Sequence, residues 1–219
     1  MTAQFVRLLD ELQRRSLRMA SLVEDIVQEV CEAAFDADER LARRAIGRDK
    51  EVDAEEVEIE AETVRLMALY QPVGSDLRFL CTVLKVNNDL ERVADCAVNI
   101  AERAMHLDKS GLGRQSDAVH QMASIVRRML RSAIQAYGVQ DAQSGQSVFP
   151  EDDAVDALYG QIIQSIVADA VRQPDRMAAF LDVLSIAKNL ERIADHATNI
   201  AEDVVFLKTG EIVRHRGGE

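Results

Sequence analysis

The chain contains two nearly identical stretches of thirteen residues, separated by an offset of 100 positions. The second runs from Leu190 to Glu202, and the first is Leu90-Glu91-Arg92-Val93-Ala94-Asp95-Cys96-Ala97-Val98-Asn99-Ile100-Ala101-Glu102. They differ only at positions 93/193, 96/196 and 98/198. Since the polar residues repeat as faithfully as the apolar ones, the chain is expected to contain one structural unit twice.

Each stretch predicts an amphipathic helix with acidic residues along one edge. At about 100° per residue and with Glu191 at zero, Glu202 lies at about 20°, Asp195 at about 40° and Asn199 at about 80°. The apolar residues fill roughly 180–340° of the same helix. The matching stripe of the first copy consists of Glu91, Asp95, Asn99 and Glu102.

The rest of the chain favours long helices as well. Hydrophobic residues make up 47% of it, aromatic residues only 4%, and Pro occurs three times, which is typical of helices packed through aliphatic side chains. Apolar residues recur at three- and four-residue spacing. This periodicity predicts six helices, at about 5–34, 36–70, 75–107, 113–141, 150–171 and 175–208.

The internal match extends beyond the two stripes. Asp38 matches Asp141 at an offset of 103, and Gln71-Pro72 matches Gln173-Pro174 at 102. We therefore predict an all-α fold of two tandem antiparallel three-helix bundles related by a pseudo-two-fold repeat, spanning 1–108 and 113–219 with a linker at about 109–112.

Three local features bear on the helix boundaries. Either Ser75 or Asp76 is expected to cap the third helix. The fifth helix is expected to start at Pro150, which aligns with Gly47, a weak point inside the second helix. The stretch Gln143-Ser144-Gly145-Gln146-Ser147 precedes that start.

Net charge and hydropathy restrict the expected partners and location of the protein. With 26 Lys and Arg against 38 Asp and Glu, the net charge of −12 argues against nucleic acid binding. The sequence has no apolar run long enough to insert into a membrane and no secretory leader, so we expect a cytoplasmic protein that could still dock on a membrane protein. Cys31, Cys81 and Cys96 are expected to be buried free thiols.

Each repeat holds a second pair of acids four residues apart: Asp49 and Asp53 in the first, Asp152 and Asp156 in the second. Facing the stripes across an antiparallel helix pair, these acids would form two carboxylate clusters. Like charges destabilise such clusters unless cations compensate. Oxygen ligands suit magnesium, calcium, manganese or iron, and His196 would suit iron or zinc, although it lies at about 140°, off the stripe.

Two other interpretations remain open. The acids could form a solvated face paired with Arg92, Arg103 and Arg192, as in a purely structural, spectrin-like bundle. The chain could also be a carboxylate-bridged di-metal protein, such as a ferritin-like oxidase or metal store, but those sites use Glu-x-x-His motifs and no Glu here is followed at +3 by His. No catalytic motif is present.

Several of these motifs, taken together, resemble those of a known protein family. Both Leu-Glu-Arg-(Val/Ile)-Ala-Asp stretches, the Asp-x-x-x-Asp pairs, Gln71-Pro72-Val73-Gly74-Ser75-Asp76-Leu77-Arg78 and Lys208-Thr209-Gly210-Glu211-Ile212-Val213-Arg214-His215 are similar to the PhoU family. The resemblance covers nearly the whole chain. It departs from the family pattern at Cys96, where His is usual, and in the Ser-Gly-Gln stretch before Pro150.

The resemblance implies one multinuclear metal cluster per repeat, of iron, zinc or manganese, with magnesium as a further candidate. The first cluster would use Asp49, Asp53, Glu91 and Asp95, and the second Asp152, Asp156, Glu191 and Asp195. The additional candidate ligands are Asn99, Glu102, Asn199 and Glu202.

The resemblance also implies a non-enzymatic role as a negative regulator of phosphate uptake and of the phosphate-starvation response. Members are thought to couple the ATPase subunit of the phosphate ABC transporter to the phosphate sensor histidine kinase. We accordingly expect a cytoplasmic homodimer, peripheral to the inner face of the cell membrane when its partners hold it there.

Overall fold

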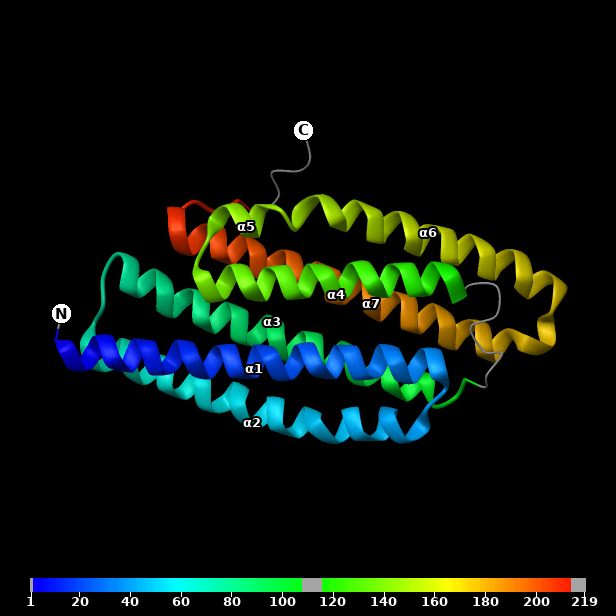
Figure 1. Cartoon of the computed structure of the whole chain (residues 1–219), viewed down its shortest axis with the longest axis horizontal. Coiled ribbons are helices and arrows are strands. Elements are labelled where there is room, and N and C mark those ends of the chain that lie inside the picture. Colours follow the sequence, from blue (N-terminus) through cyan, green and yellow to red (C-terminus); the bar gives the residue numbers. More distant parts are fainter. Residues whose placement is uncertain (1, 108–115, 214–219) are drawn as a thin grey trace.

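The computed structural model describes residues 2–107 and 116–213, and in this part of the chain all regular structure is helical. The elements lie side by side along one long axis (Figure 1). They are α1 (Ala3–Asp36), α2 (Glu39–Tyr70), α3 (Ser75–Ala104), α4 (Ser116–Val139), α5 (Ala142–Gln146), α6 (Phe149–Arg172), the 3₁₀ turn η2 (Pro174–Arg176) and α7 (Met177–Thr209). Six long helices and the all-α class are confirmed, while the predicted linker at 109–112 lies outside the described residues.

The two halves differ in their second helix. In the first half α2 is continuous through Gly47, whereas its counterpart in the second half consists of α5 and α6. A proline ring clashes with the carbonyl group four residues earlier and lacks an N–H. Pro150 therefore ends α5 at Gln146, and α6 starts at Phe149, one residue before the predicted position.

The first half packs α1, α2 and α3 together, and the second packs α4, α6 and α7, with α5 lying against α7. The most extensive contact between the halves is that of α3 with α7. Lys85 donates to Asp203 at 2.9 Å, and Arg103 lies 3.6 Å from Asp182, so the partners occur in reverse order along the two helices. The two helices are therefore antiparallel, in agreement with their course in Figure 1.

One continuous core joins the halves, because the buried residues of all six long helices belong to the same apolar cluster. Tyr137 on α4 is fully buried, and its hydroxyl lies 3.1 Å from that of Ser16 on α1. Gly145 lets α5 approach α7, since a Cβ atom at that position would lie 3.0 Å from the carbonyl oxygen of Ala201. Cys31 and Cys96 are buried as predicted, whereas Cys81 is only partly covered.

Two aspartates that match between the repeats are helix N-caps. Asp38 accepts from the backbone N–H of Leu41 at 3.0 Å, and the equivalent Asp141 accepts from that of Ser144 at 2.9 Å, so both start the second helix of their repeat. The predicted Ser75 or Asp76 cap of α3 is wrong. Gly74 precedes that helix at φ +60° and ψ −125°, where L-residues are strained, and the backbone of this glycine sets the boundary.

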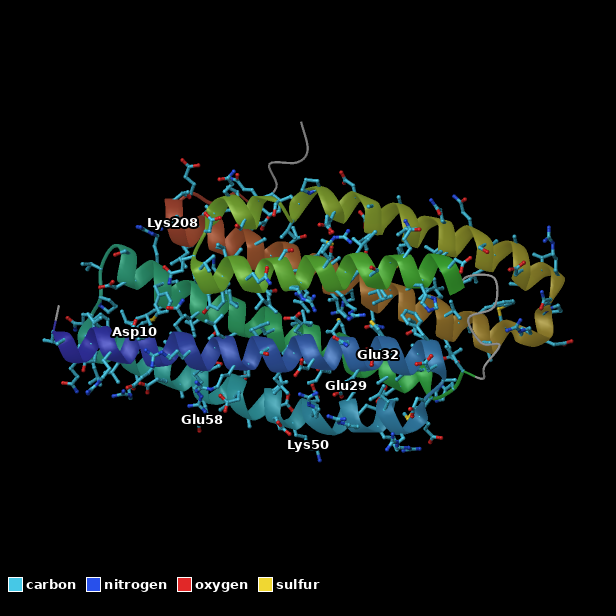
Figure 2. The ribbon with its side chains drawn as sticks, in the orientation of Figure 1. Asp10, Glu29, Glu32, Lys50, Glu58 and Lys208 are labelled. Carbon is cyan, nitrogen blue, oxygen red and sulfur yellow. The ribbon has the colours of Figure 1, made fainter. Side chains whose placement is uncertain are left out.

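The outer face of α2 and the contact between α1 and α2 carry many charges (Figure 2). Lys50 and Glu58 are exposed, and Figure 2 shows them pointing away from the bundle. Glu29 on α1 instead lies toward α2, where it accepts from Arg48 at 2.7 Å. Similarly, Arg15 donates to both carboxylate oxygens of Glu55, from Nε at 2.6 Å and from Nη2 at 3.3 Å, so charged pairs join the first two helices.

Candidate metal centres

The first predicted set of acids lies across the contact of α2 and α3. Asp49 and Asp53 are one turn apart on α2, and Glu91 and Asp95 are one turn apart on α3. Burial raises the pKa of Asp49, and the charges of Asp53 on its own helix and of Asp95 on the neighbouring helix raise it further. The fold therefore brings acids that lie more than 40 residues apart in the chain into electrostatic contact.

Glu91 extends the first set toward α2. Its pKa is raised by burial and then by Asp95, and the charges of Glu56 and Asp53 add smaller effects in the same direction. The pKa of Glu56 is itself raised by burial, Glu60 and Asp53. The acidic region of the first repeat is consequently wider than the sequence pattern alone indicated.

The second set occupies the equivalent place on α6 and α7. Burial, followed by the charges of Asp195, Asp156 and Asp153, raises the pKa of Asp152 to about 6. The pKa of Asp195 is raised by burial and by Glu191, then lowered by Lys188 and raised by Asp156. The four predicted acids of this set are thus linked: Asp156 and Asp195 act on Asp152, and Glu191 acts on Asp195.

The second set opens into a groove of about 700 Å³ between the two halves. From α6 and α7 it is lined by Asp152, Asp195, Thr198, Asn199 and Glu202, and from α3 by Leu84, Lys85, Asn88 and Asp89. The hydroxyl of Thr198 lies 3.5 Å from Asp152 Oδ1, at the edge of a hydrogen bond. A centre in the second repeat would therefore be bordered by residues of the first.

His196 does not join the carboxylates of its own repeat. Its Nδ1 lies 2.8 Å from Oδ1 of Asp89 on α3, and both side chains are largely buried. The Nδ2 of Asn199 donates to the same oxygen at 3.4 Å. The prediction that His196 lies off the acidic stripe agrees with this position, and the histidine links the halves.

Exposure does not separate the remaining candidate ligands from the eight acids, because Asp53, Asp156 and Asp195 are themselves exposed. Glu102 is exposed on α3, and Asn99 donates its Nδ2 to the backbone oxygen of Asp95 at 3.0 Å. Glu202 and Asn199 are partly covered at the groove. The twelve predicted residues thus comprise two sets of four acids and two pairs, Asn99 with Glu102 and Asn199 with Glu202.

Cations of the protein compensate only part of this charge. Arg92 lies 3.2 Å from both Glu91 and Asp95, whereas Arg103 pairs with Asp182 outside the stripe. In the second repeat Lys188 lies 2.7 Å from Glu191 and 5.4 Å from the centre of the Tyr159 ring. Of the arginines that the solvated-face interpretation pairs with the acids, Arg92 therefore makes such pairs, whereas Arg103 pairs elsewhere.

In the side-chain positions of residues 2–107 and 116–213, no three or more His, Cys, Asp or Glu side chains form a group that could hold a metal ion. Mutual repulsion keeps such carboxylates apart, and enclosing a cation would require rotation of their side chains. The donor chemistry does fit hard cations, because carboxylate and amide oxygens predominate. Burial is the first cause of the raised pKa of four of the acids, and neighbouring carboxylates raise it further.

The sequence pattern missed Asp89. This residue precedes the repeated stretch by one position, and its equivalent is Asn189, so the comparison of the two copies stopped just short of it. The signal was a pair of differences between the copies: the first has Asp89 and Cys96 where the second has Asn189 and His196.

Comparison with known proteins places this geometry in a family. The family model described as the PhoU domain matches the chain twice, at residues 16–104 and 119–204. The PhoU homologue of Pseudomonas putida, named a phosphate-specific transport system accessory protein, is 36% identical over 215 residues, which cover 98% of this chain and 84% of the relative. The homologue of Aquifex aeolicus is 35% identical, and the match covers 95% of this chain and 94% of that relative.

Solved structures agree with these matches. The crystal structure of PhoU from Pseudomonas aeruginosa has a TM-score of 0.91 at 34% identity, covering 94% of this chain and all of that one. The crystal structure of the phosphate transport system regulatory protein PhoU from Streptococcus pneumoniae has a TM-score of 0.88 at 29% identity. This match covers 95% of this chain and 99% of that one. No described helix combines the length and apolarity needed to cross a bilayer. With two matched domains and relatives of this similarity, the chain belongs to the PhoU family.

Proposed function

We propose that this chain is a non-enzymatic, metal-binding regulator of phosphate uptake and phosphate-starvation signalling. In this proposal it acts in the cytoplasm as a homodimer, binds the ATPase subunit of the phosphate ABC transporter, and keeps the phosphate sensor histidine kinase inactive while phosphate is ample. The names of the relatives, accessory and regulatory proteins of phosphate transport, support the pathway.

The observation that carries the metal part is the duplication of one carboxylate set in both halves. Burial raises the pKa of Asp49 and of Asp152, and the charges of Asp95 and of Asp195 respectively raise it further, so a bound cation would relieve repulsion in both sets. A bound multivalent cation would neutralise these charges and hold α2 to α3 and α6 to α7. The outer helix faces would remain available to partners.

The metal part is tested by elemental analysis of protein purified without chelator. The test variant carries Asp→Asn at 53, 95, 156 and 195, and we expect it to lose several equivalents of a transition metal that the unmodified protein retains. A control with the same change in charge carries Asp→Asn at the exposed positions 10, 25, 117 and 175 and should keep its metal. Metal-free protein in all three preparations would overturn this part of the proposal.

The partner part is tested separately, by binding of the purified chain to the transporter ATPase subunit and to the cytoplasmic portion of the sensor kinase. We expect both to be retained by the unmodified chain and by the control variant. Retention of neither would sink the assignment of partners and leave the metal result standing. A ferritin-like oxidase is not supported, because the Glu-x-x-His motif is absent from the sequence.

A further inference from the structure

Asp89 is a buried acid from the first repeat that faces the candidate centre of the second. It is only 6% exposed, although aspartate is seldom buried unless it is paired. Its Oδ1 is 2.8 Å from His196 Nδ1 and 3.4 Å from Asn199 Nδ2, both on α7. This acid therefore binds the two residues that flank Ala197 and Thr198 on the acidic helix of the other repeat.

These contacts fix how the side chain of Asn199 is turned. The amide presents its NH₂ group to Asp89, because Asn199 Nδ2 is the donor and Asp89 Oδ1 the acceptor. The Oδ1 atom of Asn199 is then directed away from Asp89. Asn199 lines the same groove as Asp152 and Asp195, and an amide oxygen is a suitable ligand for a hard cation.

The first repeat has no equivalent arrangement. The counterpart of Asp89 is Asn189, which donates its own Nδ2 to the backbone oxygen of Ser185 at 2.8 Å, and the counterpart of His196 is the buried Cys96. Asn99 turns back onto its own helix, to the backbone oxygen of Asp95. Only Asn199, of the two equivalent amides, is held by a carboxylate from the other half.

We propose that Asp89 is a positioning residue for the metal centre of the second repeat. It holds Asn199, and the neighbouring His196, so that the amide oxygen is presented to the carboxylates of α6 and α7. The second centre is thereby completed across the interface of α3 and α7, whereas the first centre is built within its own repeat. This inference rests on the metal-binding part of the proposed function.

Groups behind the direct ligands commonly change metal affinity by about 10–100-fold when they are removed. Losing Asp89 frees the amide of Asn199 to rotate and to compete for other acceptors in the groove. We therefore expect a change within that range for the second centre. No change is expected at the first centre, because the side chain of Asp89 bonds to His196 and Asn199 on α7.

The test uses the full chain with the first centre disabled by Asp53→Asn and Asp95→Asn, and it titrates Mn²⁺ by calorimetry and by electron paramagnetic resonance. Asp89→Asn, which preserves size, should weaken Mn²⁺ binding by about 10–100-fold. Asn199→Ala should weaken it as well, and the double variant should be no weaker than the poorer single one, because both act through the same amide. Asn189→Ala is the matched control and should bind Mn²⁺ normally.

Thermal unfolding separates positioning from a structural role. A structural loss would lower Tm equally in chelator and in Mn²⁺, whereas a positioning loss reduces the increase in Tm that Mn²⁺ produces. Unchanged Mn²⁺ affinity in Asp89→Asn, or losses that add in the double variant, would overturn this inference alone. Failure of the unmodified chain to bind Mn²⁺, Zn²⁺ or Fe²⁺ would overturn the proposed metal function with it.

Should Asp89→Asn fail to fold, Asn199→Ala still decides the matter. This substitution removes the amide from a partly exposed position and leaves the buried acid and its histidine in place. Unchanged Mn²⁺ affinity in that variant would equally overturn the role assigned to Asp89.

Discussion

The two repeats keep the same four acids and differ in what surrounds them. On α2 the acids continue with Glu56 and Glu60: beyond the effect of burial, Glu60 raises the pKa of Glu56, and Glu56 raises that of Glu91. The equivalent positions on α6 are Tyr159 and Ile163, and Lys188 lies over the tyrosine ring. The two repeats thus share four acids, while Glu56 and Glu60 add negative charge on α2 that Tyr159 and Ile163 do not add on α6.

The helix break in the second repeat sharpens this comparison. Asp49 is in the middle of α2, whereas Asp152 is in the first turn of α6, after Pro150. A helix N-terminus favours a negative charge by about 0.3–1 kcal/mol, which should lower the pKa of Asp152. Burial and the three neighbouring aspartates act in the opposite direction and raise its pKa to about 6.

The largest effect should come from disabling one repeat at a time. Asp53→Asn with Asp95→Asn should remove the metal of the first repeat, and Asp156→Asn with Asp195→Asn that of the second, because each set lies within its own helix pair. Elemental analysis should find that the two losses add up to the total content. Loss of all metal from either double variant would show that the centres are not independent.

Truncation of equivalent core leucines comes next. Leu90 and Leu190 are both almost fully buried on the central helices, so Leu90→Ala and Leu190→Ala should each lower the free energy of unfolding by about 2–5 kcal/mol. Denaturant unfolding in chelator measures this cost without a contribution from metal. A cost below 1 kcal/mol at one position only would contradict the structural equivalence of the repeats.

The same substitution should have opposite signs at two glycines of the first repeat. Gly74→Ala should destabilise the chain by about 1–3 kcal/mol, because φ +60° with ψ −125° strains any L-residue. Gly47→Ala should stabilise it by about 0.5–1 kcal/mol, since Gly47 is inside α2 and a Cβ atom there meets nothing within 4 Å. Denaturant unfolding of both variants checks the two signs, and stabilisation by Gly74→Ala would contradict the assigned turn.

Much of the fold could be predicted from the sequence because its helices are long and periodic. The helix ends were less predictable, since they depend on backbone conformation: Gly74 rather than Ser75 or Asp76 precedes α3, and η2 occupies the start assigned to the sixth helix. Pro150 was recognised as a start, but the short helix α5 before it was not, because five residues are too few to show a period.

The candidate site was predictable only within each repeat. The internal repeat identified acids such as Asp95 and Asp195 that share a helix face, and the structure brings them opposite Asp49 and Asp152. The contact of Asp89 with His196 joins residues more than 100 positions apart on different repeats. No periodicity encodes such a contact, because it depends on how α3 packs against α7.

The smallest expected effect concerns pH in the absence of metal. Since the folded pKa of Asp152, about 6, lies above the usual value of 3.8, the folded state takes up this proton before the unfolded state does as the pH falls. Stability in chelator should therefore rise from pH 7 to pH 5, and Asp152→Asn should raise Tm at pH 7 and flatten the rise. Because Asp152 is only partly buried, solvent screening should limit the change in Tm to about 1–3 °C.

Asp49→Asn is the matched variant of the first repeat and should act in the same direction, since the pKa of Asp49 is raised by the same causes. A full pH response remaining in Asp152→Asn would show that another group dominates, and the difference between the two repeats would then lie outside this carboxylate.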